Sequence, residues 1–149
     1  MENPFDDNYF MKRALAEAEF GLAKGEVPVG AVIVLNNQII ARAHNLTETL
    51  NDVTAHAEMQ AFTAAADYIG GKYLNECTLY VTLEPCQMCA GASYWAQIGK
   101  IVFGAHDEKR GFINYKTQLH PKTQVTGGVL EEECSKLIKR FFIEKRNLN

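Results

Sequence analysis

Residues 77–103 constrain the fold more than any other part of the sequence. An apolar strand is predicted over residues 77–83, a helix over about residues 86–97, and a short strand over residues 101–103. Pro85 suits the first turn of that helix, where its missing amide donor is not needed. A strand, a helix and a strand within about 27 residues predict two parallel strands joined by a right-handed crossover.

Apolar spacing predicts three more helices and a hairpin. One helix covers residues 8–24 behind Asp6 or Asp7 as N-cap, and another runs from Thr54, as its cap, to about Tyr68 before Gly70-Gly71. The hairpin joins residues 27–35 to residues 38–43 through Asn36-Asn37. The last helix presents one apolar face, formed by Val129, Leu130, Cys134, Leu137, Ile138, Phe141 and Phe142.

These elements predict a single α/β domain over residues 1–149, with helices on both sides of a mixed central sheet of about five strands. The 149 residues are 47% hydrophobic, which is enough for one core without disulfides. Residues 105–127 are the least readable segment. We expect Phe141 and Phe142 to belong to the core because both continue the apolar face of the last helix.

The sequence lacks an apolar run of about 18 residues, and its first residues are acidic rather than basic. These features predict a cytoplasmic protein without a membrane-spanning segment. Four cysteines are too few for a disulfide scaffold. Cys77 and Cys134 stand apart from the other two, and we expect them to be small buried residues.

Charge is distributed unevenly along the chain, although the net charge is only −3. Residues 1–99 carry 5 basic and 12 acidic side chains, a net charge of −7, whereas residues 100–149 carry 10 basic and 6 acidic side chains, a net charge of +4. A polyanion would therefore favour the C-terminal third.

Cys86, Cys89 and His56 form a candidate metal site. Two thiolates and an imidazole suit zinc, and three protein donors leave one tetrahedral position for water. Residues two apart on a helix diverge by about 200°, so His56 and Glu58 can both face an ion only beyond the helix end. We therefore expect both helices to direct their N-termini at the metal.

Two other interpretations of the cysteine pair remain open. Cys-x-x-Cys after a strand is also typical of a redox dithiol. The same pair could belong to a closed structural zinc site that takes a fourth ligand from the other histidines and cysteines, namely His44, His106, His120, Cys77 or Cys134. The combination of His-Ala-Glu with Pro-Cys-x-x-Cys favours zinc catalysis over both.

With these motifs the chain resembles the cytidine deaminase-like superfamily, and most closely the bacterial tRNA-specific adenosine deaminases. The resemblance rests on residues 26–32, Asn45, residues 52–58, residues 79–86 and residues 103–107, and continues in the last helix. It implies a three-layer α-β-α fold and a hydrolytic deaminase with one Zn²⁺ per chain. His56, Cys86 and Cys89 would hold the metal, and Glu58 would transfer the protons.

The resemblance further implies a tRNA anticodon loop as substrate and a homodimer. Asn45 would hydrogen-bond the flipped nucleotide and Asp107 would contact a ribose hydroxyl, although either residue could instead stabilise a turn. Tyr94 and Trp95 offer a surface for a second copy. On the predicted crossover helix we also expect Trp95 to pack against its neighbours.

Two other functions remain possible. The resemblance is weaker between Gly104 and Gly127, and residues 91–96 are similar to a segment of the guanine deaminases, which act on free bases. The chain could therefore deaminate a free base of the guanine or cytosine type. A zinc-stabilised RNA-binding subunit without activity is the third hypothesis, and the intact Glu58 argues against it.

Overall fold

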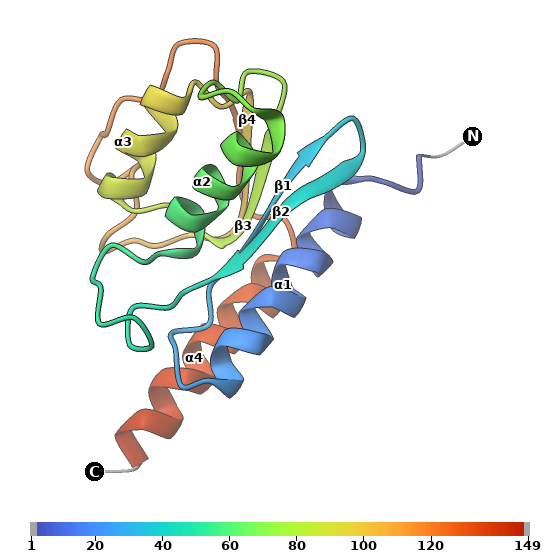
Figure 1. The fold of residues 1–149 in the computed structure, drawn as a ribbon. Helices are drawn as coiled ribbons and strands as arrows, with labels where there is room; N and C mark the ends of the chain where they lie inside the picture. The colour runs from blue at the N-terminus through green and yellow to red at the C-terminus, as the bar shows by residue number, and fades with distance from the viewer. Residues whose placement is uncertain (1–2, 148–149) are drawn as a thin grey trace.

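The computed structural model describes residues 3–147, which form a sheet with helices on both faces (Figure 1). The strands are β1 (Gly30–Leu35), β2 (Gln38–His44), β3 (Thr78–Leu83), β4 (Lys100–Ala105) and β5 (Gln124–Thr126), in the spatial order β2-β1-β3-β4-β5. β1 is antiparallel to β2 and β3, whereas β4 is parallel to β3 and β5. The sheet is mixed, and the predicted parallel crossover is confirmed.

Helices α1 (Asp7–Ala23) and α4 (Glu131–Asn147) cover one face of the sheet, and α2 (Ala57–Ile69) and α3 (Gln87–Ala96) cover the other (Figure 1). Two apolar clusters fill the spaces between the layers, one containing Ala61 and Phe62 of α2 and the other containing Phe10 and Met11 of α1. The predicted three-layer α-β-α architecture is confirmed. No helix within the described residues is both long and apolar enough to cross a bilayer.

Local sequence explains where the first elements begin and end. Asp6 caps α1, because its Oδ1 accepts a hydrogen bond of 2.9 Å from the amide of Tyr9. Asn36 and Asn37 have φ values of 51° and 61°, the backbone conformation that a tight hairpin turn requires. Gly70 ends α2 in the left-handed conformation, with φ at 76°. These predictions are confirmed.

A close approach between α1 and β1 depends on Gly30. A Cβ atom at this position would collide with the backbone of α1 at Ala14 and Ala18. The amide of Gly30 donates to Oγ1 of Thr82 on β3 over 3.1 Å, and both residues are buried. Helix α1 therefore packs directly against the sheet backbone.

Two predictions at the helix starts near the candidate site are wrong, namely Thr54 as the cap of the first helix and Pro85 inside the first turn of the second. Helix α2 begins at Ala57 with His56 as N-cap, and the Thr54 hydroxyl donates instead to Asp52 Oδ1 over 2.7 Å. Helix α3 begins after Cys86, so Pro85 precedes the helix rather than occupying its first turn. The Thr54 hydroxyl is taken by the nearer acceptor Asp52, and in both helices a candidate metal donor is the N-cap.

The remaining predictions concern the exposure of single side chains and the segment after β4. Cys77 and Cys134 are buried as predicted, at 1% exposure each. Trp95 is 78% exposed and Phe142 is 46% exposed, so the expected packing of these two side chains is wrong. β5 lies within the segment that could not be read, because three partly exposed residues paired on one edge carry little hydrophobic pattern.

Candidate metal centre

The candidate metal donors come from the N-terminal ends of two helices. His56 is the N-cap of α2 and Cys86 is the N-cap of α3, while Cys89 lies in the first turn of α3. β3 leads directly into the α3 turn, and the loop after β2 leads into α2. As the spacing of His56 and Glu58 predicts, the donor atoms meet beyond the helix ends rather than beside a helix wall.

The distances between the donor atoms fit a zinc ion. His56 Nδ1 lies 3.6 Å from Cys86 Sγ and 3.5 Å from Cys89 Sγ. Tetrahedral zinc with bonds of about 2.0–2.1 Å to nitrogen and 2.3 Å to sulfur separates the two kinds of donor by about 3.6 Å. The three residues could therefore hold zinc without rearrangement, and all three donor atoms lie within 4.8 Å of one another.

The donors also shift each other's protonation. The hydrogen bond from the Cys89 thiol, with help from His56, lowers the pKa of Cys86 to about 4. The hydrogen bond with Cys86 raises the pKa of His56. A thiolate at Cys86 is the form that a metal binds, and the positive end of the α3 dipole favours that anion.

Glu58 is hydrogen-bonded to Cys89 but lies outside the group of three donors that converges on one point. It occupies the first turn of α2 and is 4% exposed. Burial raises the pKa of Glu58 to about 7, although its own backbone amide and His56 act in the opposite direction. A buried carboxyl with such a pKa can accept and release a proton near neutral pH.

Among the described residues, no further His, Cys, Asp or Glu completes the group as a fourth donor. His44 pairs with Glu17, His106 pairs with Glu131, and His120 lies against Tyr94. All four cysteines are free. The geometry therefore supports neither a disulfide between Cys86 and Cys89 nor a closed structural site.

Asn45 joins the loop before α2 to the start of that helix. It is 8% exposed, and its Oδ1 accepts a hydrogen bond of 2.8 Å from the amide of Ala57. Gln60 strengthens the same junction, because its Nε2 donates to His44 O over 2.8 Å and to Ala55 O over 3.2 Å. The side chain of Asn45 therefore has a structural function in this chain.

Asp107 lies at the start of the loop that follows β4. Its Oδ1 accepts hydrogen bonds from the amides of Lys109 and Arg110, at 3.1 Å and 3.0 Å. This is the turn-stabilising arrangement that the sequence left open as an alternative to a substrate contact.

Two buried glutamates, Glu26 and Glu84, lie in the segments that carry the family resemblance, but the sequence indicates no role for them. Glu26 is fully buried and accepts hydrogen bonds from Glu48 and Thr49, while Glu84 is 4% exposed and accepts from Asp107 and Ile113. An acidic residue bounded by apolar strand residues, such as Glu84 after β3, was the available signal, since carboxyl groups are rarely buried without partners.

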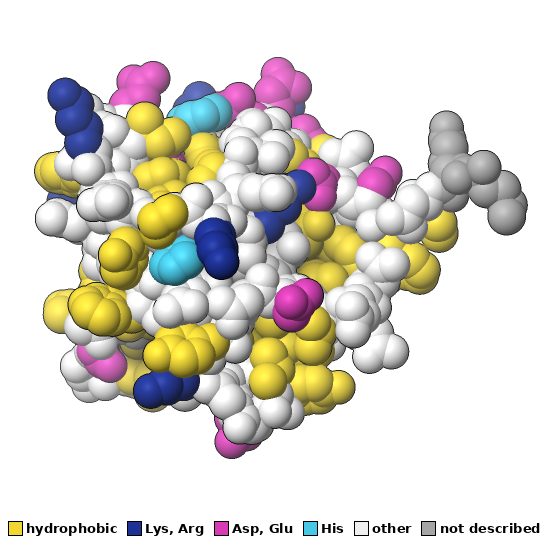
Figure 2. All heavy atoms as spheres, turned by 90° about the horizontal axis from the view of Figure 1, so that it is seen from above, with side chains coloured by type: hydrophobic (Ala, Val, Ile, Leu, Met, Phe, Trp, Pro, Cys, Tyr) yellow, Lys and Arg dark blue, Asp and Glu magenta, His cyan; other side chains and the backbone are white. Residues whose placement is uncertain are grey.

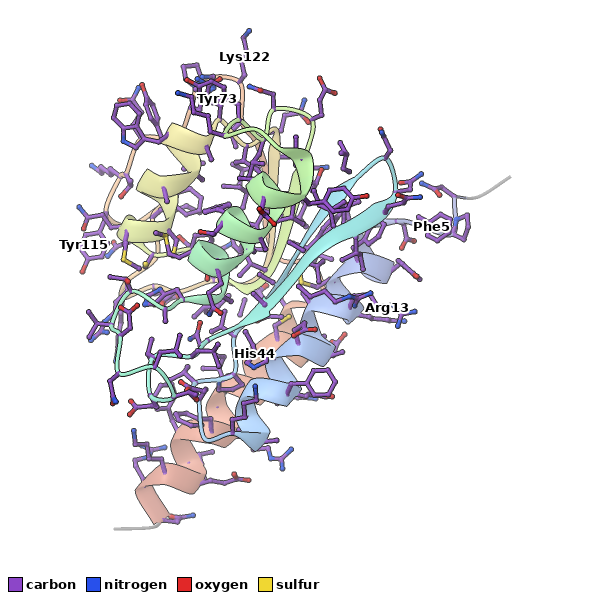
Figure 3. All side chains as sticks on the ribbon, viewed as in Figure 1. Phe5, Arg13, His44, Tyr73, Tyr115 and Lys122 are labelled. Carbon is purple, nitrogen blue, oxygen red and sulfur yellow. The ribbon has the colours of Figure 1, made fainter. Side chains whose placement is uncertain are left out.

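A hollow at the opposite end of α3 is separate from the metal donors. It has a volume of about 690 Å³ and is lined by Lys72, Tyr73, Tyr94, Trp95, Ala96, Gln97 and His120. Figure 3 places Tyr73 at the end of the molecule that Figure 2 views, where hydrophobic side chains lie beside basic ones. Helix α3 is about 15 Å long at 1.5 Å per residue, so this hollow is not part of the site.

Sequence comparison agrees with this chemistry. Residues 5–149 match the sequence profile of the MafB19-like deaminase family. The tRNA-specific adenosine deaminase of Bacillus subtilis (strain 168) is 47% identical over 146 residues, which cover 94% of this chain and 91% of that protein.

Two solved structures are also similar. One comes from a study of A-to-I editing by tRNA:A34 deaminases at the wobble position of transfer RNA; it has a TM-score of 0.81 and 41% identity, and the match covers 87% of this chain and 98% of the other. Guanine deaminase from Bacillus subtilis has a TM-score of 0.65 and 42% identity, over 68% of this chain and 65% of the other. The resemblance seen in the sequence is thus confirmed, and the chain belongs to the MafB19-like deaminase family, with tRNA-specific adenosine deaminases among its relatives.

Proposed function

We propose that this protein is a zinc-dependent hydrolytic deaminase that converts adenosine to inosine at the wobble position of a tRNA anticodon. The observation that carries the proposal is the meeting of His56, Cys86 and Cys89 at two helix N-termini, with the buried carboxyl of Glu58 beside them. Relatives of 40–47% identity named tRNA-specific adenosine deaminases support the substrate.

In this proposal His56, Cys86 and Cys89 hold one zinc ion per chain. Zinc held by these residues would supply hydroxide near neutral pH, because it would lower the pKa of a bound water toward about 7. The distances from His56 Nδ1 to the two sulfurs support this assignment, as does the low pKa of Cys86. Cys77 and Cys134 are buried elsewhere in the core and take no part.

Glu58 moves the protons. Its carboxyl accepts a proton from the attacking water and delivers it to the purine ring nitrogen. It then takes the proton of the hydroxyl added at C6 and passes it to the departing amine, so that the C6 carbonyl forms as the bond to nitrogen breaks. Water is thereby added at C6 of adenine and ammonia is released, which leaves hypoxanthine. Burial of Glu58 supports this role, since it excludes bulk water from the carboxyl.

The substrate contacts proposed for Asn45 and Asp107 have to be compatible with their hydrogen bonds inside the protein. Asn45 Oδ1 accepts from Ala57, so we assign the Nδ2 amino group as its donor to the flipped nucleotide. Asp107 uses Oδ1 for the amides of Lys109 and Arg110, so its second carboxyl oxygen is the acceptor for a ribose hydroxyl.

Basic residues support a nucleic-acid substrate. Helix α4 carries five exposed basic side chains near the C-terminal end of the chain, namely Lys136, Lys139, Arg140, Lys145 and Arg146. Basic residues near a helix C-terminus also complement the helix dipole, and Arg140 pairs with Glu144. We assign the remaining charges to the phosphates of the tRNA.

Deamination of a free base is the second candidate function. The 42% identity to guanine deaminase from Bacillus subtilis favours it, although that match covers only 68% of this chain. Both candidate functions use the same metal donors and Glu58. They differ only in the residues around the site that contact the substrate.

Parallel assays separate the two candidates. The purified protein is incubated with an anticodon stem-loop RNA that contains a wobble adenosine, and separately with free guanine, cytosine and adenosine, while ammonia and inosine are measured. We expect inosine in the RNA and one zinc ion per chain by elemental analysis. Ammonia from guanine, without inosine in the RNA, would replace the first candidate by the second.

We further propose that the protein forms a homodimer through the face of α3 that carries Trp95. An exposure of 78% is high for a tryptophan, and Tyr94 packs against its ring at a centroid distance of 5.7 Å. We expect the protein to sediment as a dimer and Trp95→Glu to shift it to the monomer. A monomeric wild-type protein at micromolar concentration would contradict this proposal.

A further inference from the structure

Glu84 lies at the junction between the sheet and the metal centre. It follows β3 directly, precedes Cys86 by two residues and is 4% exposed. Its amide donates to Ala105 O over 2.8 Å, which ties its backbone to the end of β4. The position of this residue is therefore fixed by two parallel strands before its side chain makes any contact.

The carboxyl of Glu84 holds two points of the loop that follows β4. One oxygen accepts a hydrogen bond from the amide of Asp107 and the other from the amide of Ile113, each at 3.0 Å. Gly111, which lies between Asp107 and Ile113 in the chain, packs closely against the same carboxyl. A Cβ atom at position 111 would collide with it. One side chain thus determines the path of seven residues.

The same loop also contacts the turn that carries the metal donors. Phe112 donates its amide to Pro85 O over 2.9 Å, and Gly111 forms an isolated antiparallel bridge with Cys86. Figure 3 shows Tyr115 beside the end of α3 at which that helix begins. The loop therefore lies against the metal centre, and Glu84 is the side chain that joins the two.

The contacts of Glu84 are directed at the loop backbone and not at another charge. Within the described residues it takes part in no salt bridge. A buried carboxyl is unfavourable unless its oxygens are hydrogen-bonded, and here the partners are two amides of one loop. An apolar residue would fill the same space without defining the path of the loop.

We propose that Glu84 is a positioning residue, which places residues 106–117 beside the metal centre and thereby controls binding of the polynucleotide rather than the chemical step. The loop carries Asp107 together with the exposed Lys109 and Arg110. This inference rests on the proposed function for its substrate, but the placement of the loop is measured independently of activity.

Limited trypsin digestion of the folded, zinc-loaded protein tests the placement, because Lys109 and Arg110 are exposed cleavage sites inside the loop. Glu84→Gln keeps the size of the side chain but replaces one acceptor by a donor. In Glu84→Gln we expect cleavage after these two residues to be about tenfold faster than in the wild type, because the loop opens more easily. Mass spectrometry identifies the cleavage sites and measures the rate. Gly111→Ala retains Glu84 but inserts a methyl group against its carboxyl, and we expect the same effect.

Glu26→Gln is the matched control. Glu26 is an equally buried carboxyl that accepts from the amides of Glu48 and Thr49, and it therefore holds the loop before α2 instead. We expect this variant to leave cleavage after Lys109 and Arg110 at the wild-type rate even though it lowers global stability, because its lost hydrogen bonds do not hold this loop and cleavage follows local opening. Faster cleavage in all three variants would indicate general destabilisation and would overturn the proposal.

Kinetics with the anticodon stem-loop RNA provide the second measurement. We expect KM to rise about tenfold in Glu84→Gln and Gly111→Ala, with kcat within about twofold of the wild type and an unchanged zinc content. A fall in kcat alone, or wild-type cleavage in both variants, would overturn the assignment of Glu84. If the wild-type protein leaves the RNA unchanged, the proposed function fails, whereas the protease result still decides whether Glu84 positions the loop.

Discussion

The two loops that border the metal donors are attached to the protein in different ways. The loop between β2 and α2 ends at His56, and the Asn45 side chain is bonded to the first amide of α2. The loop after β4 contributes no metal donor and is bound through its backbone amides to Glu84 and Pro85. Changes in the first loop should therefore affect the metal and the chemistry, whereas changes in the second should affect substrate binding.

Loss of Glu58 should cause the largest fall in activity. Glu58 belongs to neither loop, so its effect on kcat is the reference against which the loop variants are compared. Glu58→Ala should lower kcat by a factor of about 1,000, the effect of removing a general acid-base group. Zinc content and melting temperature should remain close to the wild type. Steady-state deamination and elemental analysis test this prediction, with the exposed Glu76→Ala as control.

Loss of one thiolate should affect the metal as well as the activity. Cys86→Ser is expected to abolish stable zinc binding and to lower the melting temperature by about 5 °C or more, because metal binding is coupled to folding. Cys77→Ser is the control, since Cys77 is buried in the core away from the donors. If Cys86→Ser retained a full equivalent of zinc, the donor assignment would be wrong.

The comparison also explains which part of the site could be predicted. His56, Cys86 and Cys89 were identified because metal donors carry a distinctive residue chemistry at short spacing, and the structure brings the three together. The turns and caps at Asp6, Asn36 and Gly70 follow from local backbone preferences. These features depend on a few neighbouring residues.

The unpredicted features depend on contacts between distant segments. Glu84 and Ile113 are 29 residues apart, and nothing in the composition of residues 106–117 indicates that their amides need a buried acceptor. Phe142 was expected in the core because it continues an apolar helix face, and Trp95 was expected to pack on the crossover helix. Neither pattern shows whether another layer covers the side chain. Whether such a side chain is exposed depends on how the whole chain packs, not on its neighbours in the sequence.

Substitution of one candidate substrate contact in each loop tests the comparison directly. Asn45→Ala should lower kcat/KM for the RNA about 100-fold, because it removes the proposed substrate donor and also the acceptor of the first α2 amide, a hydrogen bond worth about 1 kcal/mol of stability. Asp107→Ala should raise KM about fivefold with little change in kcat, since the second loop is expected to act on binding. Equal effects of both variants on kcat would break the distinction between the loops.

The smallest predicted effect concerns the pH dependence of stability. Burial of Glu26 opposes ionisation, but the hydrogen bonds from Thr49 and Glu48 outweigh it and lower the pKa of Glu26 below 4.5. A carboxyl whose pKa is lowered in the folded state stabilises the protein above its unfolded pKa, and this contribution disappears as the pH falls through the folded value.

Glu26→Gln should therefore lower the free energy of unfolding by about 2 kcal/mol near neutral pH, and the difference from the wild type should shrink below about pH 4.5. Urea unfolding at several pH values measures it. Because Glu26 holds the loop that leads to His56, this variant should also bind zinc more weakly, which Glu84→Gln should not do. Equal zinc affinity in the two variants would mean that the loop before α2 does not support the metal centre through Glu26.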